Sequence, residues 1–226
     1  MTPLDATLWG LPPGLDARLV TDADGPAQAL TEAERERMAS FGHASRRDQF
    51  ALGRLAARGL AGERLGLAPH DVPLAVAADG APTVPGLSVS IAHTGRAGET
   101  AALAAVAVRR VGVDIERVAP RRPDLWKRFL SPEEHAVLAR LGGPTDGVQT
   151  LLWTLKEAVL KAQRTGFRAG GKTVRLDLDA DGTPPARGVA RAVSGAGSWT
   201  VSFGREGDLW LALAWPAGAP RPSRSA

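Results

Sequence analysis

Val111–Glu116, with the sequence VGVDIE, is the stretch around which the rest of the chain is organised. Its apolar residues alternate with polar ones, which is typical of a β-strand. Asp114 and Glu116 are therefore expected on the same face of that strand. Two such carboxylates repel each other unless a cation lies between them, and a hard cation with oxygen ligands suits the pair. An ordinary exposed strand face is the alternative. Gly112 predicts a close approach of backbone or ligand.

A helical pattern follows further along the chain, in the segment LLWTLKEAVLK at residues 151–161. Trp153, Glu157 and Lys161 are spaced four residues apart, so they share one side of the expected helix. A glutamate four residues before a lysine also forms an ordinary helix ion pair, worth about 0.2–0.5 kcal/mol. For Glu157 and Lys161, that surface pair is the alternative to a functional role.

The two segments together, Gly-Val-Asp-Ile-Glu and then Trp-x-x-Lys-Glu-Ala-x-x-Lys, resemble the signature of the 4'-phosphopantetheinyl transferases. The length is similar to that of the Sfp-type branch. The resemblance runs from about Arg46 to Lys161, with a weaker match beyond. It implies transfer of the phosphopantetheine arm of coenzyme A to a serine of an acyl- or peptidyl-carrier protein. The other product is 3',5'-ADP, and a magnesium ion is implied on the pyrophosphate.

The amino-acid composition limits which classes of protein this chain can belong to. The 226 residues are 44% hydrophobic and 23% charged, which is typical of a globular chain with a real core. Without cysteine, disulfides and thiol nucleophiles are excluded, and a cytoplasmic location is expected. No signal peptide or membrane span is visible. The net charge of +4 favours an anionic partner such as a phosphorylated ligand, an acidic carrier protein or nucleic acid.

The order of helical and strand patterns predicts an α+β protein with two similar subdomains. Each would pack helices on a small antiparallel sheet, with the active site in the cleft between them. We expect an N-terminal subdomain at residues 1–110, a C-terminal subdomain at 111–216 and a disordered tail at 217–226. A first strand is expected at Leu4–Trp9, and a long helix beginning with a cap near Ser45. The expected oligomeric state is a monomer.

The resemblance implies a set of catalytic and metal-binding residues. Asp114, Glu116 and Glu157 match the family's magnesium ligands, with Glu157 also able to take the serine proton. Lys156 and Lys161 match the two family lysines, and both are expected at phosphate. Glu134 matches the glutamate of the family's Phe-Ser-x-x-Glu element, although Leu130 is inserted in it here. A capping-box role at the helix after Ser131 is the alternative for Glu134.

The resemblance also implies how coenzyme A is held. Binding residues for its nucleotide are predicted on a helix, a turn and the end of a strand. Ala92-His93-Thr94 departs from the family's Ser-His-Ser by losing the first hydroxyl. A structural histidine and a solvated basic helix face are the plain alternatives. The predicted set is Arg46 (with Arg47 as its substitute), Arg54, His93 and Thr94 for the 3'-phosphate, Gly80 and Pro82 for the adenine, and Asp114, Lys156 and Lys161 for the pyrophosphate.

Three other functions compete with this hypothesis. Another magnesium-dependent phosphate-transfer or hydrolysis enzyme could use the same acidic residues. An inactive relative could bind coenzyme A without transferring its arm. A basic nucleic-acid-binding protein would explain the charge, but the chain has no tyrosine, no long basic run and no recognised module for that role.

Overall fold

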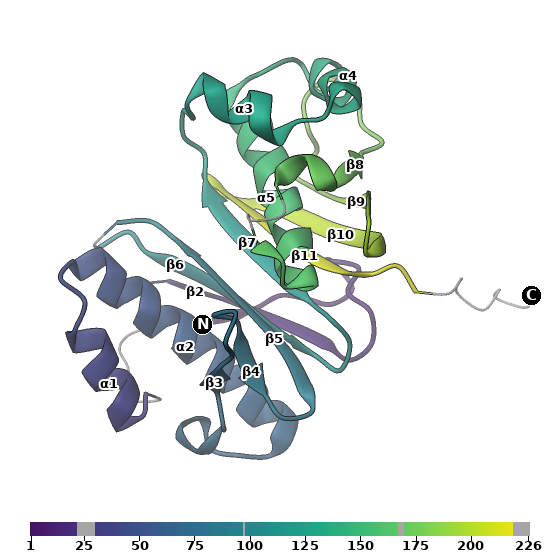
Figure 1. Ribbon diagram of the computed structural model, residues 1–226. Coiled ribbons are helices and arrows are strands. Elements are labelled where there is room, and N and C mark those ends of the chain that lie inside the picture. Colours follow the sequence, from purple (N-terminus) through teal and green to yellow (C-terminus); the bar gives the residue numbers. More distant parts are fainter. Residues whose placement is uncertain (22–29, 97, 167–169, 219–226) are drawn as a thin grey trace, which may run out of the picture.

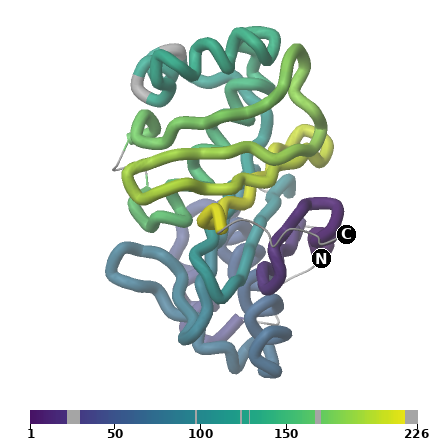
Figure 2. Tube along the Cα trace, turned by 90° about the vertical axis from the view of Figure 1, so that its right-hand side faces the viewer, coloured from purple at the N-terminus to yellow at the C-terminus, as the bar shows by residue number. Residues whose placement is uncertain are grey.

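The computed structural model describes residues 1–21, 30–96, 98–166 and 170–218. Its strands form two antiparallel sheets, one from each half of the chain (Figures 1 and 2). The first has the order β1-β2-β6-β5-β4-β3 and the second the order β7-β11-β10-β9-β8. The strand bounds are β1 Thr2–Pro3, β2 Leu15–Thr21, β3 Ala75–Val76, β4 Pro82–Val84, β5 Leu87–Thr94, β6 Ala101–Ala107, β7 Gly112–Arg117, β8 Arg175–Asp177, β9 Arg187–Ser194, β10 Gly197–Glu206 and β11 Leu209–Pro216.

Each sheet is covered by one long helix, α2 on the first and α5 on the second. The other helices are shorter, and α1 packs against α2. The helix bounds are α1 Glu32–Ala39, α2 Ala44–Leu65, α3 Pro123–Phe129, α4 Pro132–Arg140 and α5 Asp146–Gln163, with 3-10 turns at Pro69–Asp71 and Gly171–Thr173. None of the helices in the described part of the chain is long and apolar enough to cross a membrane.

The two sheets pack against each other, which gives four layers in the order helix, sheet, sheet, helix. Strand β6 shows this arrangement. Leu103 and Ala105 face the second sheet, whereas Ala102 and Ala104 face α2. Because both faces of β6 are buried, its sequence is apolar throughout rather than alternating.

Strand β7 connects the two halves of the molecule. Val113 and Ile115 pack between the sheets, so Asp114 on the same strand faces α5. The backbone N–H groups of Val111 and Val113 donate to hydroxyls on β5, at Ser88 (3.1 Å) and Ser90 (3.0 Å). These bonds fix the edge of the second sheet against the first.

The predicted α+β class, with helices packed on two antiparallel sheets, is confirmed. Two local predictions were wrong. Leu4–Trp9 forms turns rather than a strand, and Trp9 packs against Gly204 of β10. Helix α2 begins after His43 rather than at a Ser45 cap. The predicted tail at 217–226 lies outside the described residues from 219 onward, and the subdomain limits stay a prediction.

Candidate active site

Helix α5 and strand β7 bring Asp114 and Lys161 into direct contact. The Nζ of Lys161 donates to Oδ1 of Asp114 at 2.7 Å. Gly112 makes this possible, because a side chain there would collide with the backbone of α5 at Ala158 and Ala162. The close approach predicted at Gly112 is therefore made by the backbone of α5. The ion-pair partner of Lys161 is Asp114 on the strand, not Glu157 on its own helix.

Two buried carboxylate oxygens beside this pair have no hydrogen-bond partner among the described residues: Oδ2 of Asp114 and Oε1 of Glu157. Burial and the charge of Asp114 raise the pKa of Glu157 to about 7, against the opposing effect of Lys161. Burial and Asp114 also raise the pKa of Glu116. An additional cation would relieve this repulsion and give the unpaired oxygens a partner, so the carboxylates fit a divalent ion.

Glu116 differs from the other two carboxylates because both of its oxygens are engaged. Trp153 donates its Nε1–H to Oε1 at 3.0 Å, and Arg121 pairs with Oε2 at 2.9 Å. The ring of Trp153 lies between the guanidinium of Arg121 (4.6 Å) and the ring of Phe129 (4.6 Å). In the described residues, no three acidic or histidine side chains converge as a ready metal site. Magnesium there would take further ligands from phosphate and water, as it usually does.

Lys156 and Glu134 lie away from this cleft and pair with each other in the core of the second half. Lys156 is 0% exposed, and its Nζ also donates to the carbonyls of Phe129 (2.9 Å) and Gly171 (3.0 Å). Burial lowers its pKa, although Glu134 opposes that shift. Glu134 accepts from the N–H of Ser131 at 2.8 Å, as its capping-box alternative predicted. On the helix, Lys156 is turned about 100° from Glu157 and faces the core, so its predicted phosphate contact stays a prediction.

A pocket of about 330 Å³ lies between α2 and β5 and brings together most of the predicted 3'-phosphate residues. Arg46 donates its Nη1–H to Nε2 of His93 at 2.9 Å. Burial, Arg46 and Lys161 lower the pKa of His93 to about 4, so the imidazole is neutral and accepts that bond. Arg54 contributes a buried Nη1 that has no partner within the described ranges. Arg37 also lines this pocket.

Two predicted residues have other positions. Arg47 donates to the carbonyl of Phe41 at 2.7 Å, so its guanidinium is partly engaged by the protein. Thr94 is the last residue of β5, directly after His93. Gly80 and Pro82 form the predicted turn, and both line the pocket described above.

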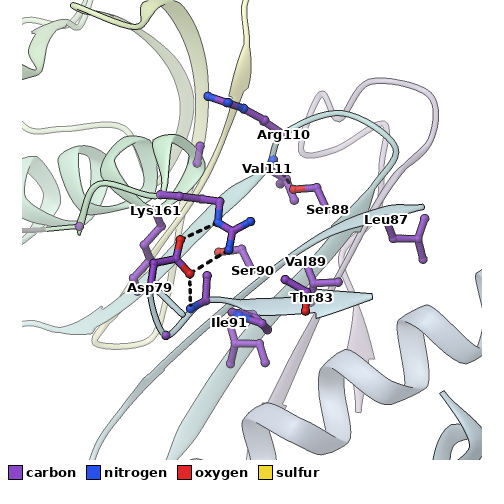
Figure 3. Close-up of a pocket in the computed structure, with 16 residues that line it drawn as sticks. Asp79, Thr83, Leu87, Ser88, Val89, Ser90, Ile91, Arg110, Val111 and Lys161 are labelled. Carbon is purple, nitrogen blue, oxygen red and sulfur yellow. Dashed lines mark hydrogen bonds and ion pairs between the residues drawn. The ribbon is translucent and has the colours of Figure 1, made fainter. Parts of the chain in front are cut away.

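A second pocket, of about 290 Å³, shares Gly80 and Pro82 with the first and lies between the two halves of the molecule (Figure 3). Lys161 and Arg164 line it from the end of α5, and Ser90 from β5. The two pockets thus meet at one turn. Together they form a basic path from His93 to Lys161.

Two comparisons with known proteins point to one family. Residues 110–214 match the family model described as the 4'-phosphopantetheinyl transferase superfamily. A protein of Bacillus subtilis named 4'-phosphopantetheinyl transferase is 29% identical over 162 residues, which is 70% of this chain and 67% of that protein. The second half of the chain is thus similar to the 4'-phosphopantetheinyl transferase superfamily. The chain is therefore an enzyme of the transferase class, and the matched segment includes β7 and α5 with Asp114 and Lys161.

Sequence reasoning missed two arginines at this site of the transferase. Arg121 follows β7 in a loop, where no periodic pattern indicates its contact with Glu116. Arg164 ends α5 with a left-handed backbone, a position at which glycine is the usual residue. An arginine at that helix end, three residues after the last lysine of the Lys-Glu-x-x-x-Lys segment, is the only sequence signal that could have found it.

Proposed function

We propose that this enzyme transfers 4'-phosphopantetheine from coenzyme A to a serine of an apo acyl- or peptidyl-carrier protein, as a member of the Sfp-type branch. The products are holo carrier protein and 3',5'-ADP. One observation carries the proposal: the Lys161–Asp114 pair lies beside the unpaired oxygens of Asp114 and Glu157, at one end of a basic path. That combination suits a substrate with a pyrophosphate and a separate phosphate group some distance from it.

The 3'-phosphate of coenzyme A would bind in the pocket formed by Arg46, Arg54 and His93. The buried and unpaired Nη1 of Arg54 supports this assignment, since a phosphate oxygen would give it an acceptor. Arg46 has further donors besides the one given to His93. Charge-assisted bonds from arginine to phosphate are among the strongest hydrogen bonds in proteins.

Lys161 would act where the phosphate–phosphate bond breaks. The serine oxygen forms a bond to the phosphorus next to the pantetheine, and the bond to the leaving phosphate breaks. The electron pair of that bond leaves with 3',5'-ADP, so negative charge grows on its phosphate. An ammonium held beside that oxygen stabilises the growing charge more than the ground state, which accelerates the reaction.

Glu157 would accept the serine proton, directly or through a water molecule, and its pKa of about 7 suits a general base. Asp114 and Glu157 are the residues that would hold magnesium, through their unpaired oxygens. Glu116, the third predicted ligand, would have to give up its contact with Trp153 or Arg121 to join them. When bound, the ion neutralises charge on the pyrophosphate oxygens. Lys156 and Glu134 have no part in this scheme, because their contacts are made within the protein core.

The same proposal covers partners and location. The net charge of +4 suits the acidic surface of a carrier protein, and the absence of cysteine suits the cytoplasm. Polyketide, peptide and fatty-acid carriers are all candidates. We propose that the enzyme acts as a monomer, with the nucleotide held by residues 1–110 and the metal by 111–216.

Mass spectrometry of an apo carrier protein tests the proposal. Three carriers, one of each class, are incubated with the enzyme, coenzyme A and magnesium. At least one should gain the mass of a single phosphopantetheine arm, with 3',5'-ADP released in equal amount. A parallel sample in excess chelator should show no gain. Release of 3',5'-ADP without carrier would instead indicate a hydrolase, and no gain on any carrier would contradict the proposal.

A further inference from the structure

Arg164 has an unusual backbone conformation. It is the C-cap of α5 with φ 61° and ψ 24°, and no other residue except glycine has a positive φ in the described part of the chain. In this left-handed region a β-carbon lies too close to the following carbonyl oxygen, which is why helices usually end there in glycine. An arginine at this position indicates that the side chain, rather than the backbone, is what the site needs.

The guanidinium of Arg164 is held flat by one carboxylate of the other half of the molecule. Its Nε donates to Oδ2 of Asp79 at 2.9 Å, and its Nη2 donates to Oδ1 at 2.8 Å. The N–H of Ala81 also donates to Oδ1, which fixes Asp79 in the turn between β3 and β4. These bonds are the dashed lines at Asp79 in Figure 3.

Stability does not account for this contact. The side chains of Arg164 and Asp79 are 46% and 39% exposed, and ion pairs at such exposure contribute little to folding. The contact does set an orientation. A guanidinium bonded along its edge uses neither of its flat faces for those bonds, and the same pocket is also lined by apolar residues such as Pro82 and Ile91.

The chemistry of the pair selects its ligand. Asp79 offsets the positive charge of Arg164, so the pair attracts a phosphate only weakly. The adjoining pocket, with Arg46 and Arg54, has an excess of positive charge and is the better place for a phosphate. A flat, uncharged aromatic ring is the better match, because arginine planes stack on nucleobases. We propose that Arg164 stacks on the adenine ring of coenzyme A, with Asp79 as the positioning residue that holds the guanidinium plane. The proposal rests on the proposed function, since it names the base-binding part of the same site.

Arg164→Gly gives a test in which a structural role and a binding role predict opposite results. Glycine relieves the backbone, so the melting temperature should stay the same or rise. Loss of the stack should weaken binding of coenzyme A and of dephospho-coenzyme A equally, by about tenfold, in calorimetry without carrier protein. Affinity for 4'-phosphopantetheine, which has no adenine, should not change. Arg191→Ala, an exposed residue of β9, removes the same charge outside the pockets and should leave all three affinities unaltered.

Asp79→Ala is a second variant that leaves the backbone of Arg164 untouched. It should weaken the binding of both adenine-containing ligands by the same factor, and that factor should be smaller than for Arg164→Gly. Wild-type affinity of Arg164→Gly for dephospho-coenzyme A would overturn the inference. So would a loss confined to coenzyme A, because that pattern belongs to a 3'-phosphate contact. Failure of the wild-type protein to bind coenzyme A would overturn the proposed function itself, which is a different result from an unaltered Arg164→Gly.

Discussion

Lys156 and Lys161 lie on the same helix, and each forms an ion pair with a carboxylate, yet their surroundings differ. Lys156 is sealed in the core with Glu134 and gives its remaining donors to two backbone carbonyls. Lys161 is 30% exposed, pairs with Asp114 and lies beside carboxylate oxygens that have no partner among the described residues. The first arrangement is complete without a ligand, and the second is not.

The difference shows that residues of one short motif can have different roles. Five residues of helix separate the two lysines by about 140° around the axis, so one faces the core and the other the cleft. A sequence signature of the Lys-Glu-x-x-x-Lys kind therefore mixes a residue that supports the fold with residues that meet the substrate. Burial and unpaired atoms, rather than membership of the motif, distinguish them.

The largest expected effect concerns the buried pair. Lys156→Ala leaves Glu134 charged and unpaired in the core, so the free energy of unfolding should fall by about 3–5 kcal/mol. Urea unfolding followed by circular dichroism measures it. Lys127→Ala, an exposed residue on α3, is the matched control and should shift stability by less than about 0.5 kcal/mol. A similar small shift for Lys156→Ala would contradict the structural role.

The next effect is on turnover. Lys161→Ala should lower the transfer rate about 10²–10³-fold, while stability and coenzyme A affinity change far less, because its contact matters most in the transition state. Lys161→Arg should restore only part of the rate, since a planar guanidinium does not replace a compact ammonium. Initial rates at saturating coenzyme A and carrier protein check this. A wild-type rate in Lys161→Ala would contradict a role for Lys161 in the transition state.

A smaller effect concerns the far end of the basic path. Dephospho-coenzyme A should bind more weakly than coenzyme A by about 2 kcal/mol, the scale of charge-assisted bonds to one phosphate. Arg54→Ala should remove most of that difference. Arg47→Ala, which loses a bond to the carbonyl of Phe41 instead, should keep it. Calorimetry with both ligands distinguishes the two arginines, and equal losses would count against the pocket assignment.

The smallest effect is a pH dependence of stability at His93. Arg46 on α2 and Lys161 on α5 face this ring, and together with burial they lower its pKa from 6.5 to about 4. The folded state thus favours neutral His93, which stabilises the protein above pH 6.5, and this contribution is lost as pH falls toward 4. The free energy of unfolding should drop between pH 7 and 5 by about 1 kcal/mol more in the wild type than in His93→Gln, allowing for solvent screening. If the free energy of unfolding depends on pH in the same way in wild type and His93→Gln, this prediction is wrong.

The sequence predicted the parts of the fold that follow from periodicity. Alternation identified β5 and β7, and the spacing of apolar residues identified α2 and α5. The short strands β3 and β4 escaped detection, because two or three residues show no period. Strand β2 was missed as well, since Arg18 interrupts its apolar run and pairs with Glu63 on α2.

The candidate site was predicted in part, for a similar reason. Strand alternation places Asp114 and Glu116 on one face, but it does not show that Arg121 and Trp153 engage Glu116. Such partners come from loops and from other elements. Nor could spacing show which acceptor each lysine meets, because that depends on how α5 packs on the second sheet.

Transfer by a variant without the buried charges tests the central claim most directly. Lys156→Met with Glu134→Gln removes both charges of the core pair and leaves the Lys161–Asp114 pair intact. Holo carrier protein is measured by intact mass at a temperature where wild type, this double variant and Lys161→Ala are all folded. We predict that the double variant transfers phosphopantetheine within about tenfold of the wild-type rate, while Lys161→Ala falls about 10²–10³-fold. A folded double variant that is as inactive as Lys161→Ala would contradict the account.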